Sequence, residues 1–128
     1  MSSYEPQLWG PGMSNTPSEV LFTLTLVFGS GALASSKGKN LTATRVTNGQ
    51  YKVALPRSYR RRTRFTHGWG KIAAGAVYFP VILTDNSASS TDPHFIVETR
   101  TEAGTATDPA SGDELDLTFG VTLDSLND

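Results

Sequence analysis

Basic and aromatic side chains are interleaved in one short segment, residues 57–71 (RSYRRRTRFTHGWGK). Its arginines are Arg57, Arg60, Arg61, Arg62 and Arg64, and its large aromatic residues are Tyr59, Phe65 and Trp69. The planar guanidinium group pairs with carboxylates or phosphates, and aromatic rings stack on bases or fill interface pockets. Since the chain supplies many carboxylates after residue 97 and has no recognisable nucleic-acid motif, this pattern favours protein contacts over nucleic acid.

Residue types that support catalysis or metal binding are sparse. Cysteine is absent, which excludes disulfides, thiolate metal sites and cysteine nucleophiles. His67 and His94 are the only histidines, and no nucleophile motif accompanies them. An acidic group could offer oxygen ligands to Ca²⁺, but its spacing is not that of an EF-hand and turns explain it; its members are Asp108, Asp113, Glu114 and Asp116. We expect no enzyme activity, no metal and no cofactor.

The net charge of −1 conceals a division along the chain. Residues 1–84 carry a net charge of +8, and residues 85–128 carry −9. One explanation is that the basic part contacts nucleic acid, a partner or another copy. The other is that strands from the two parts pair within one fold and neutralise each other. The sequence leaves both explanations open.

Length and composition indicate one β-rich domain. The chain has 128 residues and 13.7 kDa, which is the size of a single domain. Its 16 Thr, 13 Ser, 12 Gly and 7 Pro are typical of strands and loops rather than helices. No apolar run approaches the ~20 residues that span a bilayer, and the first residues lack the pattern of a secretory signal. We therefore expect no membrane contact.

Alternating apolar residues predict most of the strands. The clearest strand covers residues 20–28, where every second residue is large and apolar. Asn48-Gly49 predicts a tight type I′ turn between strands 41–47 and 50–55. Further strands are predicted near 64–69, at 77–84, at 94–101 and at 115–123, and Pro80 indicates that 77–84 is an edge strand or contains a bulge. Residues 32–40, 85–93 and 102–114 are predicted to be loops.

These six or seven strands, without an amphipathic helix, predict an all-β fold. We expect residues 19–128 to form a single antiparallel β-sandwich or jelly-roll-like barrel. Residues 1–18 have no strand period and contain three prolines, so they predict an extended N-terminal arm. Leu8, Trp9 and Met13 give this arm apolar anchors, which pack either on its own domain or on a neighbouring chain.

Two blocks of sequence resemble a known family. They are Thr44–Pro56 (TRVTNGQYKVALP) and Ala106–Phe119 (ATDPASGDELDLTF), within a similar layout over roughly residues 19–124. Both are similar to blocks of small all-β virion proteins of tailed bacteriophages, of the capsid decoration (cement) type. The resemblance implies a structural protein on the capsid surface, made in the host cytoplasm, that stabilises contacts between major capsid subunits. It brings no catalytic motif.

The partners and alternatives follow from the resemblance and the residues together. We expect a homo-oligomer, most simply a trimer, that binds the major capsid protein, with nucleic acid the weaker alternative. A tail or head-fibre base component is the alternative within the virion. A single-stranded nucleic-acid-binding β-barrel would need Tyr59, Trp69 and the arginines on one open face. A carbohydrate-binding module would need Trp69 and Tyr78 as an exposed platform. The candidate partner-binding residues are Leu8, Trp9, Met13, Arg57, Arg60, Arg61, Arg62 and Arg64.

Overall fold

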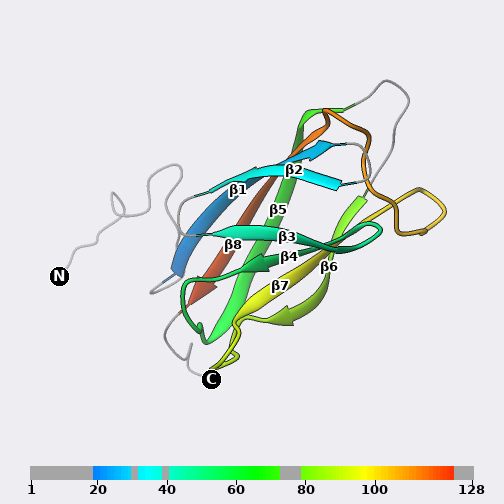
Figure 1. Ribbon diagram of the computed structural model, residues 1–128. Coiled ribbons are helices and arrows are strands. Elements are labelled where there is room, and N and C mark those ends of the chain that lie inside the picture. Colours follow the sequence, from blue (N-terminus) through cyan, green and yellow to red (C-terminus); the bar gives the residue numbers. More distant parts are fainter. Residues whose placement is uncertain (1–18, 30–31, 39–40, 73–78, 123–128) are drawn as a thin grey trace.

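The computed structural model describes residues 19–29, 32–38, 41–72 and 79–122, and every element in these ranges is a β-strand (Figure 1). In chain order the strands are β1 (Glu19–Gly29), β2 (Ala32–Lys37), β3 (Thr42–Thr47), β4 (Gln50–Ala54), β5 (Arg61–Lys71), β6 (Phe79–Asn86), β7 (His94–Arg100) and β8 (Glu114–Thr122). The all-β prediction is confirmed, with eight strands in the described ranges rather than six or seven.

The strands form two four-stranded antiparallel sheets that pack together as a β-sandwich. The first sheet has the order β2-β1-β8-β5, and the second has the order β3-β4-β7-β6. The hairpins β1–β2, β3–β4 and β6–β7 each stay within one sheet, whereas β2 to β3, β4 to β5, β5 to β6 and β7 to β8 change sheets. The late strands β7 and β8 therefore lie inside sheets whose other strands come from the earlier part of the chain.

The core lies between the sheets and is built from alternate residues of the central strands. Leu24, Leu26 and Phe28 of β1 are buried, as the alternation predicts. From β8, Phe119 stacks on Phe95 of β7, with ring centroids 4.7 Å apart. Because side chains alternate between the two faces of a strand, one apolar residue in two suffices to fill this interior.

The predicted loop at residues 32–40 is wrong in part, because Ala32–Lys37 form the edge strand β2. Its small polar residues carry no strand signal of their own. Instead, β1 offers an unpaired edge, and β2 pairs with it from Thr25↔Lys37 to Gly29↔Ala32. Leu33 adds a partly buried contact with the core. Backbone pairing with a neighbour, rather than local propensity, makes this segment a strand.

Two other strands differ in length from their predictions. β5 begins at Arg61 instead of near Arg64, because β8 pairs with it from Arg61↔Thr122 to Lys71↔Glu114. β6 extends to Asn86 instead of ending at Thr84, and residues 77 and 78 of the prediction lie outside the described residues. Pro80 lies on an edge strand as predicted. The same strand also shifts register between Ile82 and Thr84. Proline is tolerated there because an edge strand has one side without ladder hydrogen bonds.

The turn between β3 and β4 depends on Gly49. This residue has φ of 77°, a left-handed conformation that side chains with a Cβ disfavour. The turn also packs closely on a distant segment, since a Cβ at Gly49 would lie 2.5 Å from the backbone nitrogen of Thr107. The predicted hairpin is confirmed, and its tip is in contact with the β7–β8 connection.

Replacing Gly49 by alanine is expected to destabilise the fold through both the backbone strain and the clash with Thr107. Gly104→Ala is the matched control, because Gly104 also has positive φ, at 85°, but has no atom within 4 Å of an added Cβ. We expect Gly104→Ala to cost about 1 kcal/mol and Gly49→Ala about 2 kcal/mol more, in the range of an overpacked site. Urea denaturation of the two variants measures the difference, and equal losses would contradict the role of the close contact.

Candidate functional site

The two sequence blocks that carry the family resemblance meet in space at Asp108. Arg45, from the first block, donates to this carboxylate through Nε at 3.1 Å and Nη2 at 2.8 Å, both to Oδ2. Tyr51 donates its hydroxyl to Oδ1, and the backbone N–H of Gly49 donates to the same oxygen at 2.8 Å. The side chain of Asp108 is only 12% exposed, so these donors replace the water that it loses.

Asn48 completes the contact from the other direction. Its Oδ1 accepts a hydrogen bond from the backbone N–H of Asp108 at 3.0 Å, and its Nδ2 donates to the carbonyl of Ala106 at 3.3 Å. Asn48 is therefore required twice, once for the turn and once for this pairing. We call Arg45, Asn48, Gly49, Tyr51 and Asp108 together the Asp108 network.

The electrostatics of the Asp108 network hold each group in one protonation state. Burial acts to raise the pKa of Asp108, but the hydrogen bonds from Arg45, Tyr51 and Gly49 outweigh it and leave this pKa below its usual value. Burial and the hydrogen bond to Asp108 raise the pKa of the Tyr51 hydroxyl far above its usual value. The carboxylate stays charged and the phenol stays protonated at neutral pH, which suits a structural contact rather than proton transfer.

Backbone hydrogen bonds extend this contact along the β7–β8 connection. Thr99 donates its N–H to the carbonyl of Gly49 at 2.8 Å and accepts from the N–H of Thr107 at 2.9 Å. At the other end of the connection, Phe28 donates its N–H to Asp113 and accepts from Gly112 at 2.7 Å. The connection between β7 and β8 is thus fixed to the end of β1 and to the β3–β4 turn.

The acidic residues considered for Ca²⁺ do not converge. Asp108 is occupied by the Asp108 network, and Asp113 is buried with its Oδ2 accepting the N–H of Ala110. Glu114 and Asp116 lie on β8, where Asp116 accepts a hydrogen bond from Thr25. Within the described ranges, no group of three or more His, Cys, Asp or Glu residues is placed to hold a metal ion. The turn at residues 110–113 accounts for Asp113, whereas Glu114 and Asp116 belong to strand β8, so the prediction that turns explain this cluster holds only in part.

The arginines of residues 57–64 divide into two groups. Arg64 makes a two-pronged ion pair with Glu19 across β8, with both distances at 3.1 Å. This crossing passes over Gly120, where a Cβ would lie 2.6 Å from Cγ of Arg64. Arg62 reaches Asp85 of β6, with Nε 3.4 Å from Oδ2. The other members, Arg57, Arg60 and Arg61, have exposed side chains.

Ion pairs also join the basic and acidic parts of the chain. Arg45–Asp108, Lys52–Asp92 and Arg62–Asp85 each connect a residue before position 85 with one from position 85 onward. The charge division is therefore partly neutralised inside one fold.

The aromatic residues do not form an open stacking face. Tyr59 is 6% exposed and packs edge to face on Phe22 with a centroid distance of 5.7 Å. Trp69 is partly buried and packs against the core. The arrangement needed for single-stranded nucleic acid is therefore not met by Tyr59, and Trp69 is not an isolated platform for sugars. Tyr78 lies outside the described residues, as do Leu8, Trp9 and Met13 of the arm.

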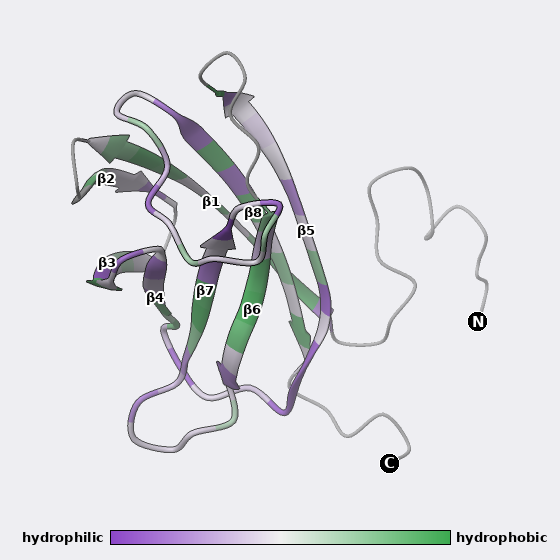
Figure 2. Cartoon of the chain, turned by 90° about the vertical axis from the view of Figure 1, so that its right-hand side faces the viewer, coloured by the Kyte–Doolittle hydropathy of each residue, from purple (hydrophilic) through white to green (hydrophobic). Residues whose placement is uncertain are grey.

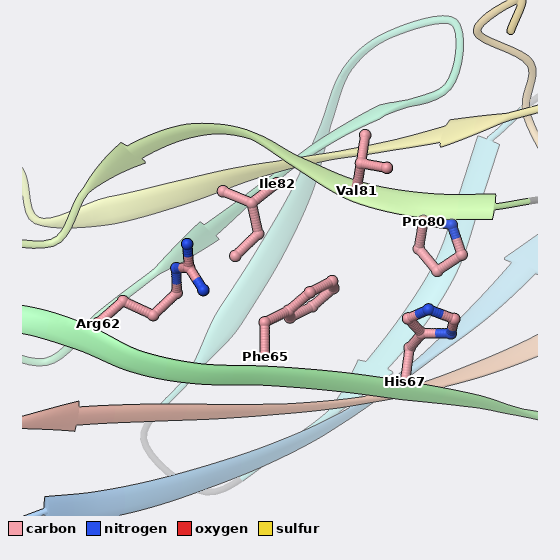
Figure 3. Close-up of a pocket in the computed structure, with 6 residues that line it drawn as sticks. All are labelled: Arg62, Phe65, His67, Pro80, Val81 and Ile82. Carbon is pink, nitrogen blue, oxygen red and sulfur yellow. The ribbon is translucent and has the colours of Figure 1, made fainter.

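Sequence reasoning missed a groove between the edge strands β5 and β6 (Figure 3). It has a volume of about 340 Å³ and is lined by Arg62, Phe65, His67, Pro80, Val81 and Ile82. In Figure 3 the side chains of Arg62, Phe65 and His67 rise from β5 toward β6, and Pro80 and Ile82 point back toward β5. The groove joins residues from different sheets, so no pattern within either strand indicates it.

Comparisons with known proteins return no match to a family model, to a curated protein or to a solved structure. Among the described residues, no helix is long and apolar enough to cross a membrane. The functional assignment therefore depends on the chain's own residues and their geometry.

The variant Asp108→Asn, which removes the charge, is expected to lower the free energy of unfolding at neutral pH by about 2–4 kcal/mol. Hydrogen bonds to a charged group each contribute about 1.5–3 kcal/mol, and the contributions of neighbouring bonds do not add fully. The folded-state pKa of Asp108 is lowered, so the carboxylate stabilises the fold above its unfolded-state pKa of about 3.9. This contribution is lost as the pH falls through the lower folded-state pKa. The difference between wild type and variant should therefore shrink below about pH 4.

Asp92→Asn is the matched control for this experiment. Asp92 also pairs with a basic side chain, Lys52 at 2.7 Å, but its own side chain is 56% exposed. We expect the control to lower the free energy of unfolding much less than Asp108→Asn does, because water screens this exposed pair. Urea denaturation of both variants at neutral and acidic pH makes the comparison, and similar losses for the two variants would contradict a special role for Asp108.

Proposed function

We propose that this chain is a structural bacteriophage virion protein of the capsid decoration type. In this proposal it binds the outer capsid surface as a homo-oligomer, most simply a trimer, and stabilises contacts between major capsid subunits. It is made in the host cytoplasm and acts by adhesion, without a cofactor and without turnover. A tail or head-fibre base component is the alternative position in the particle.

The Asp108 network is the observation that carries this proposal. The two blocks similar to phage decoration proteins are some 50 residues apart along the chain, and Arg45, Asn48, Gly49 and Tyr51 of the first meet Asp108 of the second. Two unrelated turns would not be expected to contain each other's hydrogen-bond partners. The contact between the two blocks therefore supports the interpretation that they resemble the family as one structural unit.

The character of the remaining surface also supports a role in adhesion. The two sheets are held together by a complete core, and exposed arginines flank the start of one edge strand. Individually, exposed charge contacts contribute only about 0–1 kcal/mol. In a symmetric assembly on a repeating lattice, such weak contacts are multiplied by the number of copies, which is how small decoration domains would attach firmly.

The direct test is to determine where the protein binds on a particle. Purified full-length protein, added to phage capsids that lack it, is expected to cosediment with heads and to appear in electron micrographs at regular positions on the capsid surface. Binding confined to tails would select the alternative position. Absence from both structures, with the protein folded, would overturn the proposal.

The N-terminal arm gives a second prediction within this proposal. Deleting residues 1–18 should leave a folded, soluble β domain that binds particles poorly. Trp9→Ala in the full chain should weaken binding by about thirtyfold or more, the effect typical of a buried interface tryptophan. Ser14→Ala is the control within the arm and should change binding less than about twofold. Decoration by the truncated protein at full strength would show that the arm is not an attachment element.

A further inference from the structure

The strand β6 is an edge strand with an uninterrupted apolar run. Residues 79–83 (FPVIL) are all apolar, and β6 is coloured as hydrophobic along most of its length in Figure 2. Phe79 is 49% exposed and Leu83 is 44% exposed, while Pro80 and Ile82 face the groove toward β5. Within the described part of the chain, β6 pairs only with β7. Soluble proteins usually protect such an edge with charged residues, and β6 has none between Phe79 and Thr84.

The strand on the other side of the groove, β5, has the opposite character. It is also an edge strand, with 11 residues, and the described residues pair with it only through β8. Its exposed basic residues include Arg61 and Lys71, and His67 lies in the groove. Arg62 faces the groove, but its Nε is buried and lies 3.4 Å from Asp85, so Arg61 and Lys71, which are exposed, offer the accessible donors.

We propose that the β5–β6 side binds an extended polypeptide strand that alternates carboxylate and apolar side chains. The strand adds to the edge of β5, so that its backbone pairs with the backbone groups of β5 that face away from β8. Its apolar side chains face the groove and cover Phe65 and Ile82. Its carboxylates lie on the opposite face of the added strand, where Arg61 and Lys71 are exposed. The partner is specified by charge complementarity with a basic edge and by apolar complementarity with the floor of the groove.

Charge also decides against the most direct alternative occupant. Two copies that paired β5 with β5 would bring Arg61 and Lys71 of one copy toward the same basic residues of the other. Such like-charge contacts are destabilising, and basic residues and register shifts at an edge are a common way to prevent self-pairing. β5 has both features, since its register shifts between Arg62 and Arg64 and again between Trp69 and Lys71. The edge therefore disfavours its own copy while it attracts an acidic strand.

This inference deepens the proposed function, because it assigns the binding surface and the chemistry of the partner. It rests on the proposed function only for the partner's location in a virion. The test can be made with purified protein and does not need phage particles. The probe is a labelled synthetic peptide, as long as β5, in which Glu alternates with Val and Phe. Fluorescence anisotropy with the full chain should detect binding, and a peptide with Lys in place of each Glu should bind at least about tenfold more weakly.

Matched variants separate this side from the rest of the surface. Arg61→Glu on β5 should weaken binding of the Glu peptide about tenfold, whereas Lys37→Glu, the same charge change on the opposite edge strand β2, should change it less than about twofold. Ile82→Ala on β6, whose side chain points into the groove, should weaken binding about fivefold or more. Val46→Ala on β3 is its control, because Val46 is 53% exposed and remote from the groove strands in the sheet order.

Amide hydrogen exchange supplies a readout that simple charge attraction would not change. If the peptide adds as a strand, the β5 amides that face away from β8 should exchange more slowly in its presence. Unchanged exchange of β5, or equal losses for Arg61→Glu and Lys37→Glu, would overturn the proposal.

Two other results would assign this side to a different occupant and would also overturn the proposal. One is tight binding of labelled single-stranded oligo-dT that is lost in Arg61→Glu. The other is concentration-dependent self-association of the full chain, measured by sedimentation, that Leu83→Ser abolishes. If the peptide binds as expected but the protein binds no phage particle, the proposed function fails while the assignment of this strand-binding side stands.

Discussion

The partly buried carboxylate of Asp108 is the constraint on which the arrangement of this end of the sandwich depends. A carboxylate removed from water needs charged or polar donors in fixed positions, and here Arg45, Tyr51 and the backbone of Gly49 supply them. These donors can reach it only if the β3–β4 hairpin and the β7–β8 connection lie against each other. The β7–β8 connection in turn hydrogen-bonds to Phe28 at the end of β1, so one carboxylate orders segments from both sheets.

The order of strands within the sheets explains the uneven distribution of charge along the chain. β7 and β8, which follow residue 85, each lie between two strands from the earlier part of the chain. Asp92, just before β7, pairs with Lys52 of β4, and Asp85 of the edge strand β6 pairs with Arg62 of the edge strand β5. These pairs partly neutralise the two parts of the chain, and exposed basic residues lie at the start of β5, next to the groove.

The two sides of the molecule therefore differ in what they can do. At the end of β1, a dense set of hydrogen bonds fixes loops in place, and the Asp108 network leaves no ionisable group free to exchange a proton at neutral pH. At the β5–β6 side, both sheets end in strands whose outer edges are unpaired among the described residues, with apolar and basic side chains between them. A stiff frame that presents one adhesive side is consistent with a role in assembly, where geometry matters more than reactivity.

The sequence alone determined the fold class, the Asn48-Gly49 turn, the inward faces of β1, β7 and β8, and the edge position of Pro80, because these depend on alternation and on local backbone preferences. It also pointed to both blocks of the Asp108 network, but not to their contact, since no local pattern encodes which distant donor a buried carboxylate meets. Strand β2 was not predicted, because its pairing with β1, and not its own residues, makes it a strand. Only the tertiary structure decided which arginines are paired, with Arg62 and Arg64 in ion pairs and Arg61 exposed. It also decided that a groove lies beside them. Both features depend on which strands become neighbours across the two sheets.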